Sequence, residues 1–183
     1  DADASAAGGK FKKIVVPTNG ANGLSQPTWV DVNNDRIPDY IYAGDMQGNL
    51  WRFDVRSADP GAWRVSYFEK PLFTAKDASG TALPITGAPE FSFHRLGGIV
   101  VNVVTGKSVT SDDFPNGSRT NGMFGIWDKP AFAVIDEATD MEDALPRDLS
   151  DLEERELHNV GTDTQTRYLT GDAIDWNTKL GWY

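Results

Sequence analysis

The chain has 183 residues, of which 39% are hydrophobic and 24% are charged, so it is long enough and apolar enough to bury a substantial core. Its formal net charge of −10 argues against a nucleic-acid partner, because phosphate binding requires clustered Lys and Arg side chains. The absence of cysteine excludes disulfides, Cys-based zinc sites and thiol nucleophiles. No apolar run approaches about 18 residues, so we expect no transmembrane segment.

Short apolar runs recur along the chain, rich in Val, Ile, Phe, Tyr and Trp and bounded by Gly, Pro, Asn or Asp. This composition favours strands over helices. Residues 1–10, DADASAAGGK, are typical of a linker or a truncated start, and residues 11–183 are expected to form the folded part. We therefore predict an all-β fold with strands at 13–16, 27–30, 39–44, 50–55, 89–94, 98–104 and 122–127.

The segment 39–55 is predicted to be one β-hairpin. Asp45 is suited to start its turn, and Gly48 to occupy a position with positive φ. In LWRFDV, residues 50–55, every second side chain starting at Trp51 falls on one face, which is the alternation of a half-buried strand.

The second half of the chain gives weaker signals. A second hairpin is predicted to join 89–95 to 98–104, followed by a long polar loop over 105–121. The segment 148–158 begins DLSDLEEREL, which has the spacing of a capping box but only a thin apolar face. A helix and a charged edge strand both remain open for it.

One short loop carries oxygen atoms at a spacing typical of calcium sites. Asp31, Asn33 and Asp35 occupy its positions 1, 3 and 5, the backbone carbonyl of Ile37 falls at position 7, and Asp39 at position 9. A chain that curls around a hard cation presents oxygens at alternate positions, and Ca²⁺ takes about six to eight of them. We predict a Ca²⁺ site formed by these five residues.

The loop departs from the helix-flanked EF-hand pattern. Position 12 is Tyr42 inside a predicted strand rather than Glu, so Asp39 would have to close the site with both carboxylate oxygens. Arg36 stands where such loops usually have Gly, which indicates a different turn or an outward-pointing side chain. The alternative is an ordinary turn, since Asp and Asn side chains readily bond their own backbone.

Other chemistry is not singled out by the sequence. His94 and His158 are isolated, and each is more typical of a core or surface histidine than of a ligand. The 27 acidic residues make chance pairs common, and the aromatic residues are expected mainly in the core. We predict no catalytic residue and no enzymatic activity.

The segment VDVNNDRIPDYIYAGDMQGNLWRFDV, residues 30–55, resembles the signature of the PilY/PilC family of type IV pilus biogenesis factors and adhesins. In that family an Asp-rich calcium loop runs into a hairpin of this kind. The resemblance extends along most of the chain, through NGLSQP at 22–27, PLFTA at 71–75, FGIWD at 124–128 and GWY at 181–183.

The resemblance implies that residues 11–183 are part of a C-terminal β-propeller domain that contains the calcium loop at 31–39. Propeller blades take about 40 to 50 residues, so roughly three or four blades or blade-like sheets with long loops are expected. It assigns Ca²⁺ ligation to the same five loop residues. Asn33 stands where the family often has Asp.

The resemblance also implies a function and a location. Members of the family look like secreted, pilus-associated factors at the bacterial outer membrane and cell surface. They are implicated in pilus assembly, in calcium-dependent control of pilus extension against retraction (twitching motility), and in adhesion. Expected partners are pilus components such as minor pilins at the pilus tip, and a host-surface receptor. Two alternatives remain. One is a fragment of a propeller-type quinoprotein dehydrogenase, whose blades would repeat a tryptophan motif, and the other is a general cell-surface adhesin that binds a protein or a glycan.

Overall fold

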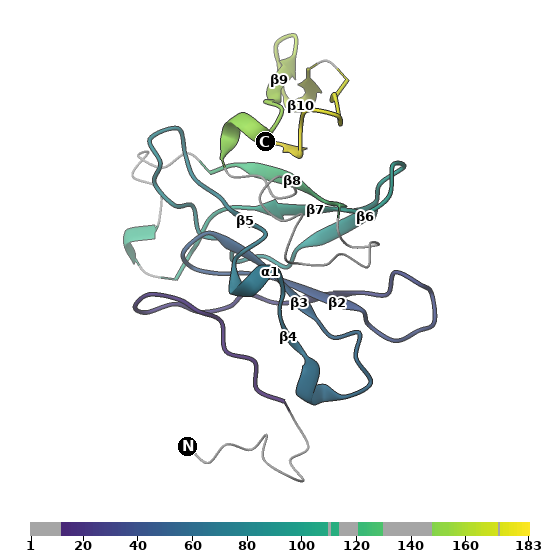
Figure 1. Ribbon diagram of the computed structural model, residues 1–183. Coiled ribbons are helices and arrows are strands. Elements are labelled where there is room, and N and C mark those ends of the chain that lie inside the picture. The colour runs from purple at the N-terminus through teal and green to yellow at the C-terminus, as the bar shows by residue number, and fades with distance from the viewer. Residues whose placement is uncertain (1–11, 110, 114–120, 130–147, 172) are drawn as a thin grey trace.

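The computed structural model describes most of the chain, namely residues 12–109, 111–113, 121–129, 148–171 and 173–183. This part forms three antiparallel sheets, with five, four and two strands (Figure 1). The all-β prediction is confirmed, and three sheets agree with the predicted three or four blade-like units. The predicted linker at 1–10 lies outside the described residues.

The first sheet is built on the predicted hairpin of residues 39–55. Its strands run in the order β1–β2–β3–β4, and β5 also pairs with β3, at the opposite end from β4. Gly48 has φ 83° in the hairpin turn, as predicted, which a residue with a side chain would adopt only under strain. The strand bounds are β1 Thr28–Val30, β2 Tyr40–Gly44, β3 Asn49–Asp54, β4 Arg64–Val65 and β5 Phe73–Thr74.

The second sheet contains the other predicted hairpin and has the order β11–β8–β7–β6. Its central pair, β7 and β8, is in register from Ile99 opposite Asp128 to Val104 opposite Met123. The strand bounds are β6 Glu90–Phe93, β7 Ile99–Val104, β8 Met123–Asp128 and β11 Gly181–Trp182.

The main core lies between these two sheets, which are stacked face to face in Figure 1. Tyr40 and Leu50 from the first sheet and Ile99 and Ile126 from the second are almost completely buried. Each large aliphatic side chain buried in this way stabilises the fold by about 1.5–3 kcal/mol. The packing of two apolar faces therefore fixes how the first sheet sits on the second.

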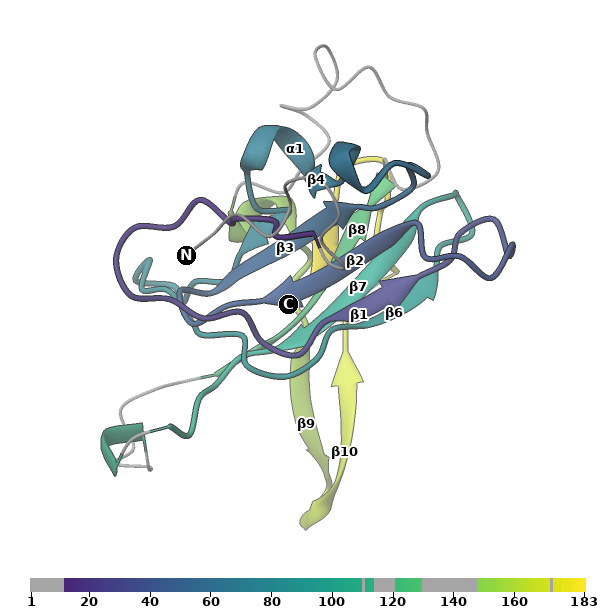
Figure 2. The same cartoon turned by 90° about the horizontal axis from the view of Figure 1, so that it is seen from below.

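The third sheet is a hairpin of β9 (Glu156–Val160) and β10 (Asp163–Thr170) that projects from the body of the molecule in Figure 2. The segment 148–158 contains both structures that the sequence left open. A short 3-10 helix, η4 (Leu149–Asp151), is capped by Asp148, and β9 follows it. Two further 3-10 helices, η1 (Pro60–Ala62) and η2 (Ser111–Asp113), lie in loops.

Two predictions were wrong. Residues 13–16 form no strand, although Ile14 and Val16 pack on the outer face of the first sheet against a cluster that includes Trp51. This cover explains the second error. β3 is not half-buried, because Trp51 and Phe53 are covered on that outer face while Leu50 belongs to the main core.

No helix in the described part of the chain is long and apolar enough to cross a membrane. The element labelled α1, Ser66–Glu69, is also not an ordinary helix. Tyr67, Phe68 and Glu69 have φ values of 57°, 52° and 63°, which makes it a left-handed turn. Each such residue costs about 1–2 kcal/mol, so other contacts must hold the turn in place.

Candidate metal site

The predicted calcium loop, residues 31–39, connects β1 to β2. Two backbone hydrogen bonds fix its closing end: the N–H of Asp39 donates to the carbonyl of Val30 at 2.8 Å, and the N–H of Val55 donates to the carbonyl of Asp39 at 3.0 Å. Residues 33–37 between these anchors are exposed. The loop is therefore a solvent-facing turn mounted on paired strands.

Asp31 organises the first half of the loop. Its Oδ1 accepts the backbone N–H of Asn34 at 2.6 Å and that of Asp35 at 3.3 Å, and its Oδ2 accepts the N–H of Arg36 at 2.7 Å. Three consecutive amides thus point toward one carboxylate. The chain curls around the Asp31 carboxylate, which is local backbone bonding that the ordinary-turn alternative also expects.

Asn33 and Asp35 repeat this local pattern. Asn33 Oδ1 accepts the N–H of Asp35 at 2.8 Å, and Asp35 Oδ1 accepts the N–H of Ile37 at 2.8 Å. The Asn33 side-chain amide also donates to Asp35 Oδ2 at 3.1 Å. The side chains at positions 1, 3 and 5 are therefore linked through one compact turn.

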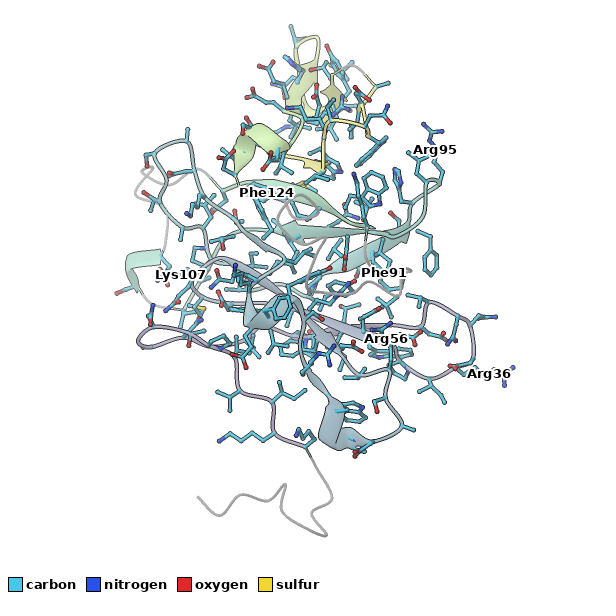
Figure 3. All side chains as sticks on the ribbon, in the orientation of Figure 1. Arg36, Arg56, Phe91, Arg95, Lys107 and Phe124 are labelled. Carbon is cyan, nitrogen blue, oxygen red and sulfur yellow. The ribbon has the colours of Figure 1, made fainter. Side chains whose placement is uncertain are left out.

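Two left-handed residues make the curl possible. Asn34 has φ 62° and Arg36 has φ 73°. Asn tolerates this conformation comparatively well, and Arg less well. Arg36 stands at the position where calcium loops usually have Gly, and it adopts the backbone conformation that Gly usually takes there. Its side chain points outward in Figure 3.

The last two predicted ligands lie where the loop returns to the sheet. Asp39 is buried, and its Oδ2 accepts the N–H of Val32 at 2.8 Å, which ties the two arms of the loop together. The side chain of Ile37 is 63% exposed, and only its backbone carbonyl was predicted to take part. Asp39 therefore closes the loop structurally.

The donor set of the loop fits a hard cation, since carboxylate, amide and carbonyl oxygens are the ligands that Ca²⁺ prefers. Each carboxylate oxygen has two lone pairs and can accept an N–H while facing an ion. Within the described residues, however, no three or more His, Cys, Asp or Glu side chains converge as a metal site. The structure brings Asp31, Asn33 and Asp35 together, and it holds Asp39 against Val32 instead.

A second carboxylate centre lies at the other end of the β2–β3 hairpin. Asp45 Oδ1 accepts the backbone N–H groups of Gln47 at 2.8 Å and Asn49 at 2.9 Å, which confirms its predicted role in the turn. Its Oδ2 accepts side-chain N–H groups of Asn22 at 2.8 Å, Asn49 at 2.9 Å and Trp51 at 2.7 Å. Asp45 is fully buried, so it is the centre of a closed hydrogen-bond network.

A third carboxylate, Asp128, joins the two large sheets, and the sequence did not single it out. Arg52 on β3 donates from Nη1 to both oxygens of Asp128 on β8, at 3.1 and 3.0 Å, and from Nε to Ser66 Oγ at 3.0 Å. Tyr42 donates to Asp128 Oδ2 at 2.6 Å, and the Tyr67 hydroxyl donates to Oδ1. All five side chains are buried.

The two phenols and the guanidinium of this network stay protonated at neutral pH. Burial, and then the negative charge of Asp128, raise the pKa values of Tyr42 and Tyr67 well above the ordinary range, so both phenols stay protonated donors. Burial is the largest influence on Arg52 and would lower its pKa, but Asp128 and the neighbouring tyrosines together outweigh it, and the net pKa is raised. The Tyr67 contact also accounts for the left-handed turn at Ser66–Glu69, because it anchors that turn between the sheets.

The sequence matches a family of pilus proteins. Residues 2–145 match the family model described as the PilY1 beta-propeller domain. The chain is 42% identical over 132 residues to the type IV pilus biogenesis factor PilY1 of Pseudomonas aeruginosa, across 60% of this chain and 11% of that protein. It is 28% identical over 173 residues to a PilY1 homolog of Xylella fastidiosa, across 91% of this chain and 11% of that protein.

A solved structure supports the same assignment. The fold is similar to the crystal structure of the Pseudomonas aeruginosa PilY1 C-terminal domain, with a TM-score of 0.73 and 31% identity. The similarity covers 91% of this chain and 39% of that domain. The chain spans about one tenth of the curated relatives it matches. From its sequence and its fold alike, the chain belongs to the PilY1 β-propeller family.

Proposed function

We propose that this chain is a calcium-binding structural and regulatory module of a type IV pilus biogenesis protein. The observation that carries the proposal is the curl of residues 31–36, in which one carboxylate collects three consecutive amides and two residues adopt left-handed conformations. Such a curl directs successive oxygen-bearing residues around one centre. Asp31, Asn33, Asp35, the carbonyl of Ile37 and Asp39 would hold the ion.

Bound Ca²⁺ would supply positive charge among three carboxylates that repel one another in its absence. The loop is tied to β1 through Val30 and to the end of β3 through Val55, so a change in its order is transmitted to paired strands. Asp39 has two roles, because it accepts a hydrogen bond from Val32 at the start of the loop and also belongs to the predicted ligand set. Calcium would therefore stiffen the junction of β1, β2 and β3.

The role of the whole protein follows from its relatives, which are named type IV pilus biogenesis factors. We infer a secreted, pilus-associated protein at the bacterial cell surface that supports pilus assembly, calcium-dependent control of extension against retraction, and surface adhesion. Its partners would be pilus components, including minor pilins at the tip, and a host-surface receptor. The module itself would be non-catalytic, in contrast to the quinoprotein dehydrogenase alternative.

A cellular experiment tests this role. The bacterium that carries this protein would be given Asp39→Asn, and surface pili and twitching would be measured with calcium and with a chelator. We expect the variant in calcium to behave as the parent does under chelation. Asp77→Asn is the matched control, since Asp77 also accepts several N–H groups in an exposed turn. A calcium response retained in Asp39→Asn, or lost equally in Asp77→Asn, would contradict the proposal.

A further inference from the structure

Three rings meet on the second sheet, on residues far from the calcium loop in sequence. The ring centre of His94 lies 4.3 Å from the ring centre of Trp127 and 4.4 Å from that of Trp176. The ring centres of the two indoles are 5.3 Å apart, and their planes meet at 80°. Trp127 is held in place by donating its indole N–H to the carbonyl of Gly97 at 2.8 Å. The cluster therefore joins the β6–β7 turn, β8 and the segment before β11.

An open pocket of about 520 Å³ lies beside this cluster. Its walls are the turn Leu96–Gly98, the indoles of Trp127 and Trp176, and the polar residues Lys129 and Asn177. Ligand pockets commonly span about 300–1,000 Å³ and combine apolar walls with a few placed polar groups. The Asn177 side chain is oriented by its bond to Asp175 at 2.9 Å, so one polar wall is fixed.

Two cationic side chains lie near the pocket in a protein whose net charge is −10, and the carboxylate of Asp175 lies beside the pocket, where it is bonded to Asn177. The ammonium of Lys129 lies 4.4 Å from the ring centre of Trp127, and Arg95 extends from the tip of the β6–β7 hairpin in Figure 3. Burial lowers the pKa of His94, and the charges of Arg95 and Lys129 lower it further. Two cations therefore lie near a largely neutral aromatic cluster.

From this geometry we infer that the pocket binds an acidic saccharide, with the C–H face of a pyranose ring on the partly exposed indole of Trp176 and its carboxylate paired with Lys129 or Arg95. A sugar ring offers an apolar face and a polar rim, which suits aromatic walls with fixed polar neighbours. Guanidinium and ammonium groups bind carboxylates through charge-assisted hydrogen bonds. The surface would add carbohydrate recognition to the pilus module.

A cationic ligand fits this site less well, although aromatic cages often bind quaternary ammonium groups. Lys129 already occupies the cation position over Trp127, and it would repel a second cation together with Arg95. Sugars without a carboxylate would keep the stacking contact and lose the ion pair. The structure therefore favours acidic sugars over their neutral counterparts and over choline.

Calorimetric titration of the chain with N-acetylneuraminic acid and with galacturonic acid tests the inference and separates the two sources of acidic sugar, host-type glycans and uronic-acid polysaccharides. Galactose, N-acetylglucosamine and choline serve as comparison ligands. We expect saturable binding of at least one acid at millimolar concentration, weakened by added NaCl because an ion pair contributes. The neutral sugars and choline should bind at least about tenfold more weakly, which corresponds to about 1.4 kcal/mol.

Matched variants locate the binding. Trp176→Ala should lower affinity by about tenfold or more, a factor worth about 1.4 kcal/mol, and the double variant Lys129→Gln/Arg95→Gln should remove the salt dependence. Trp29→Ala replaces a 62% exposed tryptophan on β1 and should leave binding unchanged. Circular dichroism would verify that each variant is folded. No saturable binding of either acid, equal binding of neutral sugars or choline, or undiminished binding in folded Trp176→Ala would overturn the inference.

Discussion

The two ends of the β2–β3 hairpin use aspartate in different ways. At one end, Asp31 accepts only backbone N–H groups from its own exposed loop. At the other, Asp45 is fully buried and accepts five N–H groups, three of them from the side chains of Asn22, Asn49 and Trp51. A carboxylate surrounded by protein donors is a structural centre, whereas one with lone pairs facing solvent retains capacity for a cation.

This comparison predicts opposite responses to substitution. The buried carboxylates of Asp45 and Asp128 should matter for stability whatever the ionic conditions, and those of Asp31 and Asp35 in the calcium loop should matter mainly when calcium is present. The same contrast extends to Asp128, which is as buried as Asp45 but is paired with a charged partner.

The largest effect is expected for Asp128→Ala. Removing one partner of a buried ion pair leaves an uncompensated charge on Arg52 and costs about 3–5 kcal/mol. Tyr42 and Tyr67 would also lose their acceptor. Urea unfolding would measure the loss, and Arg52→Met combined with Asp128→Leu should recover much of it. A loss below about 1 kcal/mol would show that the network does not hold the sheets together.

Asp45→Asn should have the next largest effect. The substitution keeps the shape but replaces one accepting oxygen with an NH₂ group, so buried donors such as the Trp51 indole N–H lose a partner. Each unsatisfied buried group costs about 1–3 kcal/mol. The decrease in the free energy of unfolding should be the same with and without calcium. A loss that appears only in calcium would mean that Asp45 belongs to a metal site.

The phenols of the Asp128 network predict a dependence on alkaline pH. The pKa values of Tyr42 and Tyr67 are raised by burial and by Asp128, so their stabilising contribution is complete below the unfolded-state pKa of about 10 and is lost as the pH rises above it. Each group contributes a slope of about 1.4 kcal/mol per pH unit in that window. Tyr42→Phe should show a shallower decline above pH about 10 than the parent chain. Tyr168→Phe, at a half-exposed position, should match the parent.

The smallest effect on stability is expected for Asp35→Asn without calcium. Asp35 is exposed, and asparagine can still accept the N–H of Ile37, so the free energy of unfolding should change by less than about 0.5 kcal/mol. With calcium present, the same variant should lose stability relative to the parent, because one anionic ligand is gone. A large loss in the chelated protein would show that the loop is a purely structural turn.

The difference between local and distant contacts explains what the sequence could predict. The spacing from Asp31 to Asp39 and the turn at Asp45 and Gly48 are encoded within a few residues, and the structure contains both turns. The Arg52–Asp128 pair is separated by 76 positions, so no local pattern connects its members. The one local indication of this ion pair was the presence of Arg52 among the apolar side chains of β3.

The failed predictions have a related cause. Ile14 and Val16 pack against the first sheet while Val15 is 68% exposed, so the alternation at 13–16 was real, but whether such a segment pairs as a strand depends on a neighbour that periodicity does not identify. The same packing buried the second face of β3. The pocket residues were missed because Trp127 and Trp176 come from separate segments and were expected in the core.

Calcium titration of the chain tests the central claim most directly, by calorimetry and thermal unfolding, with Asp39→Asn and the control Asp77→Asn in parallel. We predict one site with a dissociation constant of about 10⁻⁶ to 10⁻⁴ M, and little effect of Mg²⁺, which requires a tighter octahedral shell. At a hundredfold excess over that constant, calcium should stabilise the parent by about 2.7 kcal/mol, an increment lost in Asp39→Asn and kept in Asp77→Asn. Zero sites, equal shifts with magnesium and calcium, or an undiminished shift in Asp39→Asn would contradict the account.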